Sequence, residues 1–293
     1  MNPDTACTSD QWSVLTSAAS NSQLAGVLGG FLVTAIALLF DKNSREGVHT
    51  LALFSSAVLI LMLDSVLFSL LTGTQPAESG DRRGICAIAW AQGALSTGML
   101  AAGATGLFGG LGWMLASHAV NKMPSDSTND VRAFCFLADL GGWLTFGAAM
   151  ATTLILNETL IDYLQFMRGG SLPSWLTTFV LAVTGAVIVV DGLLVYVRTR
   201  TLRKSLADTG ETTRLALRSI KVATVGTVVL AVGGSWLAVS LARIPDWLTQ
   251  SDVLIIVLVV ILTFVLPTMV STAICYSVAS TEERPRLIAR RTT

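Results

Sequence analysis

The stretch that decides the fold is 253–278, VLIIVLVVILTFVLPTMVSTAICYSV, which contains no charged residue. A bilayer core about 30 Å thick is crossed by about 20 apolar residues in a helix. The stretch is too long for a strand and lacks apolar–polar alternation, so it predicts a membrane-spanning helix. Six more runs of the same kind precede it: Leu24–Phe40, Val48–Leu71, Ile85–Ser117, Val131–Leu156, Ser174–Val197 and Ile220–Ala242.

The composition supports this interpretation. Of the 293 residues, 52% are apolar and only 13% are charged, whereas an ordinary soluble domain carries roughly 25% charged residues. Too few charges remain to cover a water-facing surface, which excludes a soluble enzyme, a disordered chain and a nucleic-acid-binding protein. The sequence therefore predicts an all-α, polytopic membrane protein that folds as a seven-transmembrane-helix bundle.

The basic residues predict the orientation. Among the 19 Lys and Arg residues, only Arg82, Arg83, Arg168 and Arg243 lie on the side of the N-terminus. Because basic loops stay in the cytoplasm, we expect the N-terminus outside and the C-terminus inside. Arg outnumbers Lys, which is typical of a GC-rich bacterial genome, so we expect a bacterial plasma membrane.

Three regions follow from this topology. Residues 1–22 form an exported tail, within which Ser9–Ser20 could lie on the membrane as an interfacial helix. These residues contain no Lys or Arg, so they lack the charged segment of a signal peptide and the first span is expected to be retained. Residues 23–278 form the transmembrane domain, and residues 279–293 form a basic cytoplasmic tail.

Small residues predict where the helices approach each other closely. Gly26 and Gly30 form one GxxxG pair, and Gly106 and Gly110 form another. Such pairs let two helix backbones approach, so we expect helix packing at these positions. The glycine-rich run that ends at Gly112 leaves a second interpretation open, in which the third helix is broken to line a binding site.

Pro267 lies inside the last span and removes one backbone hydrogen bond. The hydroxyl of Thr263, four residues earlier, is placed to occupy the carbonyl group that Pro267 leaves free. We therefore expect a kinked seventh helix.

Three carboxyl groups fall inside the predicted spans: Asp64, Asp139 and Asp191. Ionisable groups at such depth are costly and usually mark function. At 1.5 Å per residue, Asp139 and Asp191 lie about 12 Å and 9 Å above the inner surface, and Asp64 about 10 Å below the outer one. Asp139 and Asp191 are therefore expected to share a level. The basic residues within the predicted spans, His49, Arg132 and Lys221, all lie at the cytoplasmic ends. None lies deeper, so the acids form either a proton or cation path or a set of protonated groups bonded between helices.

Charged residues at the helix ends suggest further sites. Glu158 and Asp162 follow the fourth span and are candidates for an outer mouth. The basic cytoplasmic segment 198–221 is expected either to contact lipid headgroups or to dock a partner protein. The headgroup candidates are Arg198, Arg200, Arg203 and Lys204.

The cysteines offer one pairing. Cys7 lies in the exported tail and Cys86 begins the third span on the outer side, whereas Cys135 and Cys275 fall toward the reducing cytoplasm. Cys7 and Cys86 are therefore placed to form a disulfide, with two free thiols as the alternative.

The motifs of several enzyme classes are absent, including HExxH, GxSxG and the P-loop. The last span lacks the lysine that a retinal pigment needs. No CxxC pair indicates a metal site, and we expect no cofactor and no enzymatic activity. The sequence favours a cation or proton channel or transporter, and the alternative is a non-catalytic subunit, sensor or scaffold that binds a partner membrane protein or a second copy of itself.

Overall fold

The computed structural model describes residues 7–9, 12–40, 45–74, 82–121, 128–205, 213–244 and 252–277. Within these residues, seven helical segments are long and apolar enough to cross a membrane, which confirms the predicted all-α class. Six are continuous and the seventh is divided into three parts. The helices are α1 (Val14–Phe40), α2 (Arg45–Thr72), α3 (Arg82–Asn121), α4 (Thr128–Arg168), α5 (Ser174–Ser205), α6 (Thr213–Arg243), and the divided span α8 (Asp252–Val260), η2 (Ile261–Val265) and α9 (Leu266–Ser277).

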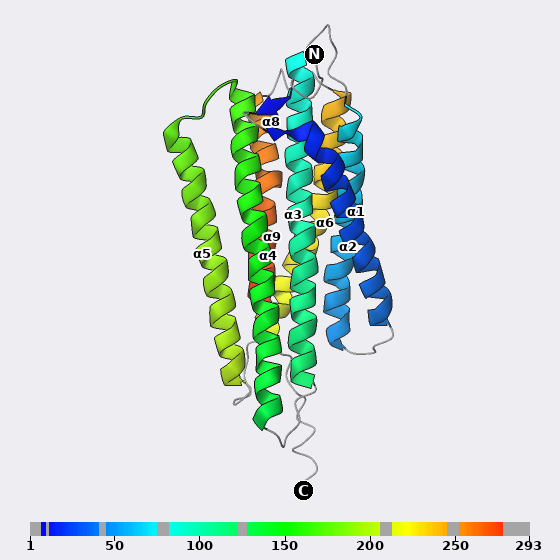
Figure 1. Cartoon of the computed structure of the whole chain (residues 1–293), viewed down its shortest axis with the longest axis vertical. Coiled ribbons are helices and arrows are strands. Elements are labelled where there is room, and N and C mark those ends of the chain that lie inside the picture. Colours follow the sequence, from blue (N-terminus) through cyan, green and yellow to red (C-terminus); the bar gives the residue numbers. More distant parts are fainter. Residues whose placement is uncertain are drawn as a thin grey trace.

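Helix α3 is the centre of the bundle. It packs against α2, α4, α6 and the divided seventh span, and α2 also packs against α6. Helix α1 lies against α2 at one edge, and α5 stands at the opposite edge, where it packs on α4 and α9 (Figure 1). The interior shared by α2, α3 and α6 is thus separate from the α5–α9 boundary.

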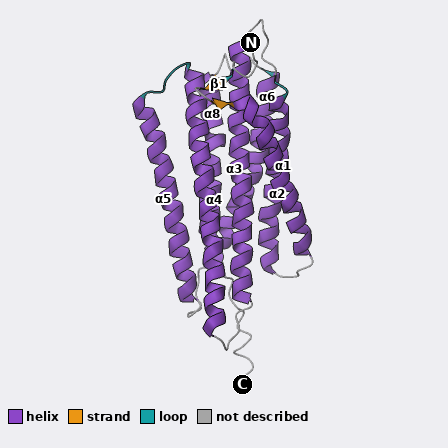
Figure 2. Ribbon diagram, in the orientation of Figure 1, coloured by secondary structure: helices purple, strands orange, loops and turns teal. Residues whose placement is uncertain are grey.

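The N-terminal segment differs from the predicted surface helix. Strands β1 (Thr8–Ser9) and β2 (Trp12–Ser13) form a two-stranded antiparallel pair at one end of the bundle (Figure 2). Helix α1 then begins at Val14, because the Ser13 hydroxyl accepts a hydrogen bond from the Thr16 amide at 3.3 Å and caps the helix. The expectation of a separate interfacial helix over Ser9–Ser20 is therefore wrong, since α1 runs without a break from Val14 into the first span.

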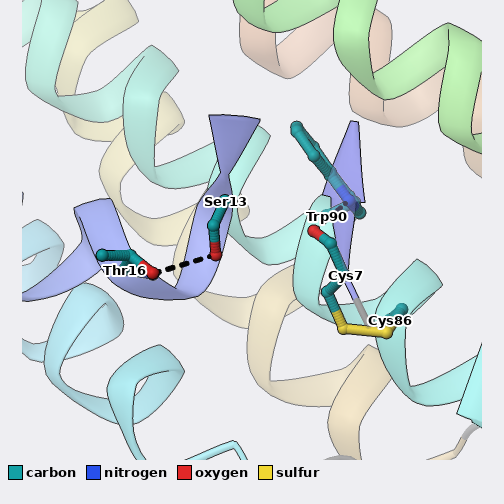
Figure 3. Close-up of a disulfide and its surroundings, with 5 residues drawn as sticks. All are labelled: Cys7, Ser13, Thr16, Cys86 and Trp90. Carbon is teal, nitrogen blue, oxygen red and sulfur yellow. Dashed lines mark hydrogen bonds between the residues drawn. A yellow bond between two sulfur atoms is a disulfide. The ribbon is translucent and has the colours of Figure 1, made fainter. Parts of the chain in front are cut away.

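A disulfide between Cys7 and Cys86 ties this segment to the first turns of α3 (Figure 3). The two Cα atoms are 5.1 Å apart. The indole nitrogen of Trp90 donates a hydrogen bond to the Cys7 carbonyl at 3.1 Å, and the Trp90 ring stacks on Phe166 of α4 with centroids 5.9 Å apart. The sequence placed these two cysteines together as a possible pair, and the structure joins them.

Helix α3 is continuous, so its glycines do not break it. A Cβ atom added at Gly106 would lie 3.2 Å from Ala57 of α2, and one at Gly110 would lie 2.1 Å from the Phe54 ring. Both glycines therefore let α3 approach α2 closely. The broken-helix interpretation of the glycine-rich run is wrong, because these positions are occupied by packing contacts.

Only one glycine of the first GxxxG pair, Gly26, packs against another helix. A Cβ atom at Gly26 would lie 3.4 Å from the Ser65 hydroxyl of α2, whereas one at Gly30 meets nothing within 4 Å. Gly30 is exposed on the outside of the bundle, so the prediction that it packs against another helix is wrong.

The seventh span contains a π-helical segment just before Pro267. The Leu266 amide donates to the Ile261 carbonyl, five residues earlier, in place of the usual four. Pro267 has no N–H, so the carbonyl of Thr263 loses its usual partner and the wider turn accommodates this loss. The Thr263 hydroxyl has no hydrogen-bond partner among the described residues, so the predicted side-chain cap is absent there. Instead, α3 packs against this backbone at Gly98, where an added Cβ atom would lie 3.0 Å from the Thr263 carbonyl oxygen.

Candidate functional site

Asp64 lies in the interior shared by α2, α3 and α6. Buried residues recur along α2 at helical spacing, and Asp64 follows Ile60 and Leu61 and precedes Leu67 and Phe68 in that stripe. The periodicity therefore places its carboxyl group in the bundle and not toward lipid. The side chain is fully buried, and neither carboxyl oxygen has a hydrogen-bond partner among the described residues.

Ser96 of α3 adjoins this carboxyl group. Ser96 is 1% exposed, and the Ser96 hydroxyl group also lacks a hydrogen-bond partner of ideal geometry in the described part of the chain. Buried polar groups in folded proteins are nearly always paired, and Ser96 is the hydroxyl group placed to pair with Asp64.

Ser235 of α6 lies at the same level as Ser96. The Gln92 amide nitrogen of α3 donates to the Ala238 carbonyl of α6 at 2.9 Å, and a Cβ atom at Gly234 would lie 3.1 Å from the sulfur of Met99. Because α3 and α6 run antiparallel, these two contacts bracket Ser96 on one helix and Ser235 on the other.

The Ser235 hydroxyl is also buried without a hydrogen-bond partner among the described residues. Ser235 is four residues after Ala231 and three before Ala238, both fully buried, while the neighbouring Trp236 is 60% exposed. Its hydroxyl therefore lies on the inner side of α6, where this helix meets α2 and α3. Asp64, Ser96 and Ser235 are together called the α2–α3–α6 polar site below. Of these three residues, only Asp64 could be identified from the sequence, because a serine in a membrane span gives no signal of its own.

Asp191 occupies a second buried position, between α5 and α9. It is 1% exposed, and it adjoins Thr272 and Cys275 of α9. One of its carboxyl oxygens, Oδ1, has no hydrogen-bond partner among the residues described. Asp191 therefore faces the seventh span, on a different helix boundary from Asp64.

Asp139 and Asp191 do not share a level, which corrects the expectation from their depths. Asn157 of α4 accepts a hydrogen bond from Thr184 of α5 at 2.9 Å, and a Cβ atom at Gly192 of α5 would lie 3.2 Å from the Phe146 ring. This antiparallel register places Asp191 opposite about residue 148, which is about 14 Å along the helix axis from Asp139. The depth estimate failed because it took Val131 and Val197 as level, whereas Val195 and Thr199 of α5 lie against Gly142 of α4.

Asn157 is a polar residue that sequence analysis did not single out. Its side chain is 1% exposed, and its amide nitrogen also donates to Glu158 at 3.3 Å. It joins α4 to the peripheral helix α5. Glu158 and Asp162 both lie within α4, near its end, and their role at an outer mouth stays a prediction.

A chain of hydroxyl groups links three helices near the middle of the bundle. The Thr105 hydroxyl of α3 lies 3.2 Å from that of Thr152 of α4 and 3.3 Å from that of Ser271 of α9. Thr105 and Thr152 also donate to carbonyl groups of their own helices. These residues are satisfied structural contacts, in contrast to the α2–α3–α6 polar site.

Arg198 was expected to contact lipid headgroups, and the structure corrects this. Its side chain is 9% exposed, and its guanidinium carbon lies 3.9 Å from the centroid of the Tyr276 ring of α9. The cation therefore packs on an aromatic face inside the bundle. Arg200 is exposed, so a headgroup contact there stays a prediction.

Some predicted features lie outside the residues that the structure describes. These include the basic tail 279–293 and the side chains of Arg203, Lys204 and Cys135. Among the described residues, no group of three or more His, Cys, Asp or Glu could hold a metal ion.

Comparison with known proteins gives no relative from which a role could be transferred. No protein-family model, curated protein or solved structure matches this chain.

Proposed function

We propose that this integral membrane protein is a channel or transporter that moves a proton or a small cation across the membrane, with Asp64 as its principal binding group. One observation carries the proposal: a fully buried carboxyl group whose two oxygens both lack hydrogen-bond partners among the described residues. Burying a carboxyl group in a membrane costs roughly 3 kcal/mol on insertion scales, so a chain that retains one without a structural partner is expected to use it.

The charge around Asp64 supports the same role. The apolar stretches of the three surrounding helices, 50–72, 84–117 and 222–242, contain no Lys, Arg or His. An ionised Asp64 therefore needs a positive ion from outside these helices, and an un-ionised Asp64 carries a proton. Either state makes the carboxyl group a binding group for a cation.

The remaining parts of the proposal follow the sequence. We place the N-terminal side outside and the protein in a plasma membrane, a bacterial inner membrane given its composition. Asp191 and Asp139 are candidate groups on the cytoplasmic half of the route. They act as two separate positions because the α4–α5 register keeps them apart.

Reconstituted protein provides the test. Purified chain in proteoliposomes is given proton, sodium or potassium gradients, with and without a membrane voltage, and the flux of each ion is followed. We expect flux of at least one ion, lowered at least about tenfold by Asp64→Asn, since tenfold corresponds to about 1.4 kcal/mol.

The matched control is Ser56→Ala, on the same helix, where the buried hydroxyl donates to the Leu53 carbonyl of its own helix at 2.9 Å. Its flux is expected to stay at the wild-type level. Wild-type protein that moves no ion under any gradient or voltage would overturn the proposal.

A second candidate function is a membrane subunit or sensor that binds a partner protein. The outer segment favours it, because the disulfide to Cys86 and the Trp90 hydrogen bond hold residues near Cys7 in one place, as a recognition surface requires. In that case Asp64→Asn leaves partner binding unchanged, whereas loss of the disulfide weakens it.

A further inference from the structure

We propose that the first turn of α1 closes the disulfide-linked end of the bundle above Asp64, and that the Cys7–Cys86 disulfide holds this closure in place. The inference rests on the proposed function, because it concerns access to the carboxyl group that binds the ion. Asp64 is fully buried, so an ion reaches it only when a covering contact opens. The contacts at the start of α1 identify one such cover.

Val14, the first residue of α1, fills a notch between α2 and α3. A Cβ atom at Gly93 of α3 would overlap the Val14 side chain and would lie 3.5 Å from Leu71 of α2. Gly93 therefore lacks a side chain at the point where Val14 enters the boundary between the two helices. Val14 and Leu71 are 6% and 0% exposed, so the notch is filled.

The filled notch lies above Asp64 along the same helix boundary. Leu71 is two helical turns beyond Asp64 on the same face of α2, which corresponds to about 10 Å. Gly93 is about one turn nearer the disulfide than Ser96, the α3 residue that adjoins the Asp64 carboxyl group. Both helices thus place Val14 between Asp64 and the disulfide-linked end of the bundle.

Contacts along one stripe of α3 hold the start of α1 in place. Cys86, Trp90 and Gly93 follow one another at helical spacing. Cys86 is bonded to Cys7, and the Trp90 indole donates to the Cys7 carbonyl at 3.1 Å (Figure 3). Gly93 receives Val14. The segment that runs from Cys7 to Val14 is therefore fastened to α3 at both of its ends.

Without the disulfide, the start of α1 is easier to displace. Helix α1 lies at the edge of the bundle and packs mainly on α2. Segments near a chain terminus open at little cost unless they are tied down, and a disulfide removes most of their open states. Breaking the Cys7–Cys86 bond therefore raises the population of molecules in which Val14 has left the notch.

The test measures access to the covered boundary in the full-length protein in detergent, without any transport assay. Ser96→Cys places a thiol below the notch, and its modification by a positively charged, water-soluble methanethiosulfonate is followed by mass spectrometry of the peptide that contains position 96. Val14→Ala empties the notch, and Cys7→Ala combined with Cys86→Ala removes the disulfide. Both changes are expected to raise the rate of modification at least about tenfold, because the rate follows the population of open molecules.

Leu32→Ala is the matched control. Leu32 is 1% exposed and lies about five helical turns beyond Val14 on the same helix, so its truncation weakens the packing of α1 without emptying the notch. The rate at position 96 is expected to stay unchanged. All rates are measured well below the unfolding temperature of each variant. If Ser96→Cys does not fold, Leu71→Cys provides a second thiol next to Val14.

Two results would overturn the inference: an unchanged rate in either the Val14 variant or the disulfide variant, or an equal rise in Leu32→Ala. These outcomes are distinct from failure of the proposed function. Greater access in both variants without any ion flux would leave the closure standing and refute transport, whereas Asp64-dependent flux with unchanged access would refute the closure and leave transport standing.

Discussion

The contact between Gly112 of α3 and Gly141 of α4 allows a sharp test of the packing. A Cβ atom at Gly112 would lie 2.6 Å from the Gly141 carbonyl oxygen and 2.6 Å from the Thr145 hydroxyl, and one at Gly141 would lie 2.7 Å from the Gly112 carbonyl oxygen. Since ordinary contacts begin near 3.4 Å, the two backbones must separate if either glycine is replaced. Gly112→Ala is therefore expected to destabilise the protein.

The magnitude follows from two opposing effects. Overpacking of a well-packed interior costs about 1–3 kcal/mol, and replacing glycine by alanine inside a helix returns about 1 kcal/mol. We expect a net loss of up to about 2 kcal/mol, which lowers the unfolding temperature of a chain of this size by up to roughly 6 °C.

The assay is thermal unfolding of the purified protein in detergent, with Gly147→Ala as the matched control. Gly147 lies on the same helix as Gly141, but a Cβ atom there meets nothing within 4 Å. The control is therefore expected to melt at or slightly above the wild-type temperature. If Gly112→Ala melts as high as Gly147→Ala, the close approach of α3 and α4 is refuted.

Three other predictions concern the disulfide-linked end of the bundle, the peripheral helix and the orientation. Cys86→Ser opens a disulfide that spans 79 residues of sequence, so the free energy of unfolding should fall by up to about 4 kcal/mol; an unchanged melt with and without reductant would count against the bond. Asn157→Leu leaves the Thr184 hydroxyl without its 2.9 Å acceptor, so hydrogen exchange in α5 should rise by the equivalent of about 1 kcal/mol, whereas equal exchange would show that another contact holds α5. A reporter fused at Thr209 should be cytoplasmic and one fused after Arg168 should be exported; export of the first would reverse the orientation.

Much of the fold could be predicted because each span is an independent consequence of composition. An apolar run of sufficient length must form a helix in lipid, since no water is present to satisfy its backbone. The boundaries were less accurate where the chain leaves the apolar region. Helix α4 continues past Leu156 to Arg168, and α1 begins at Val14, because a helix can extend into water beyond the membrane and is then ended by local capping.

The candidate site was predictable only in part. A lone aspartate in a span is visible in the sequence, and Asp64 was identified in this way. Ser96 and Ser235 were not, because serine is common in membrane helices and is usually satisfied by a carbonyl of its own helix, as Ser56 is. Only the assembled bundle distinguishes a satisfied hydroxyl from one without a partner.

The sequence by itself determined the number of membrane-crossing helices, the burial of a carboxyl group in the second of them, and the one cysteine pair suited to a disulfide. Each of these properties follows from local composition or from the order of segments along the chain. The tertiary structure decided that Asp64 faces Ser96 of α3, that Asp191 and Asp139 lie at different levels, and that Arg198 packs on Tyr276. Helical periodicity specifies which face a side chain occupies, but the sliding of one helix along another depends on close contacts between segments far apart in sequence, such as Gly112 with Gly141.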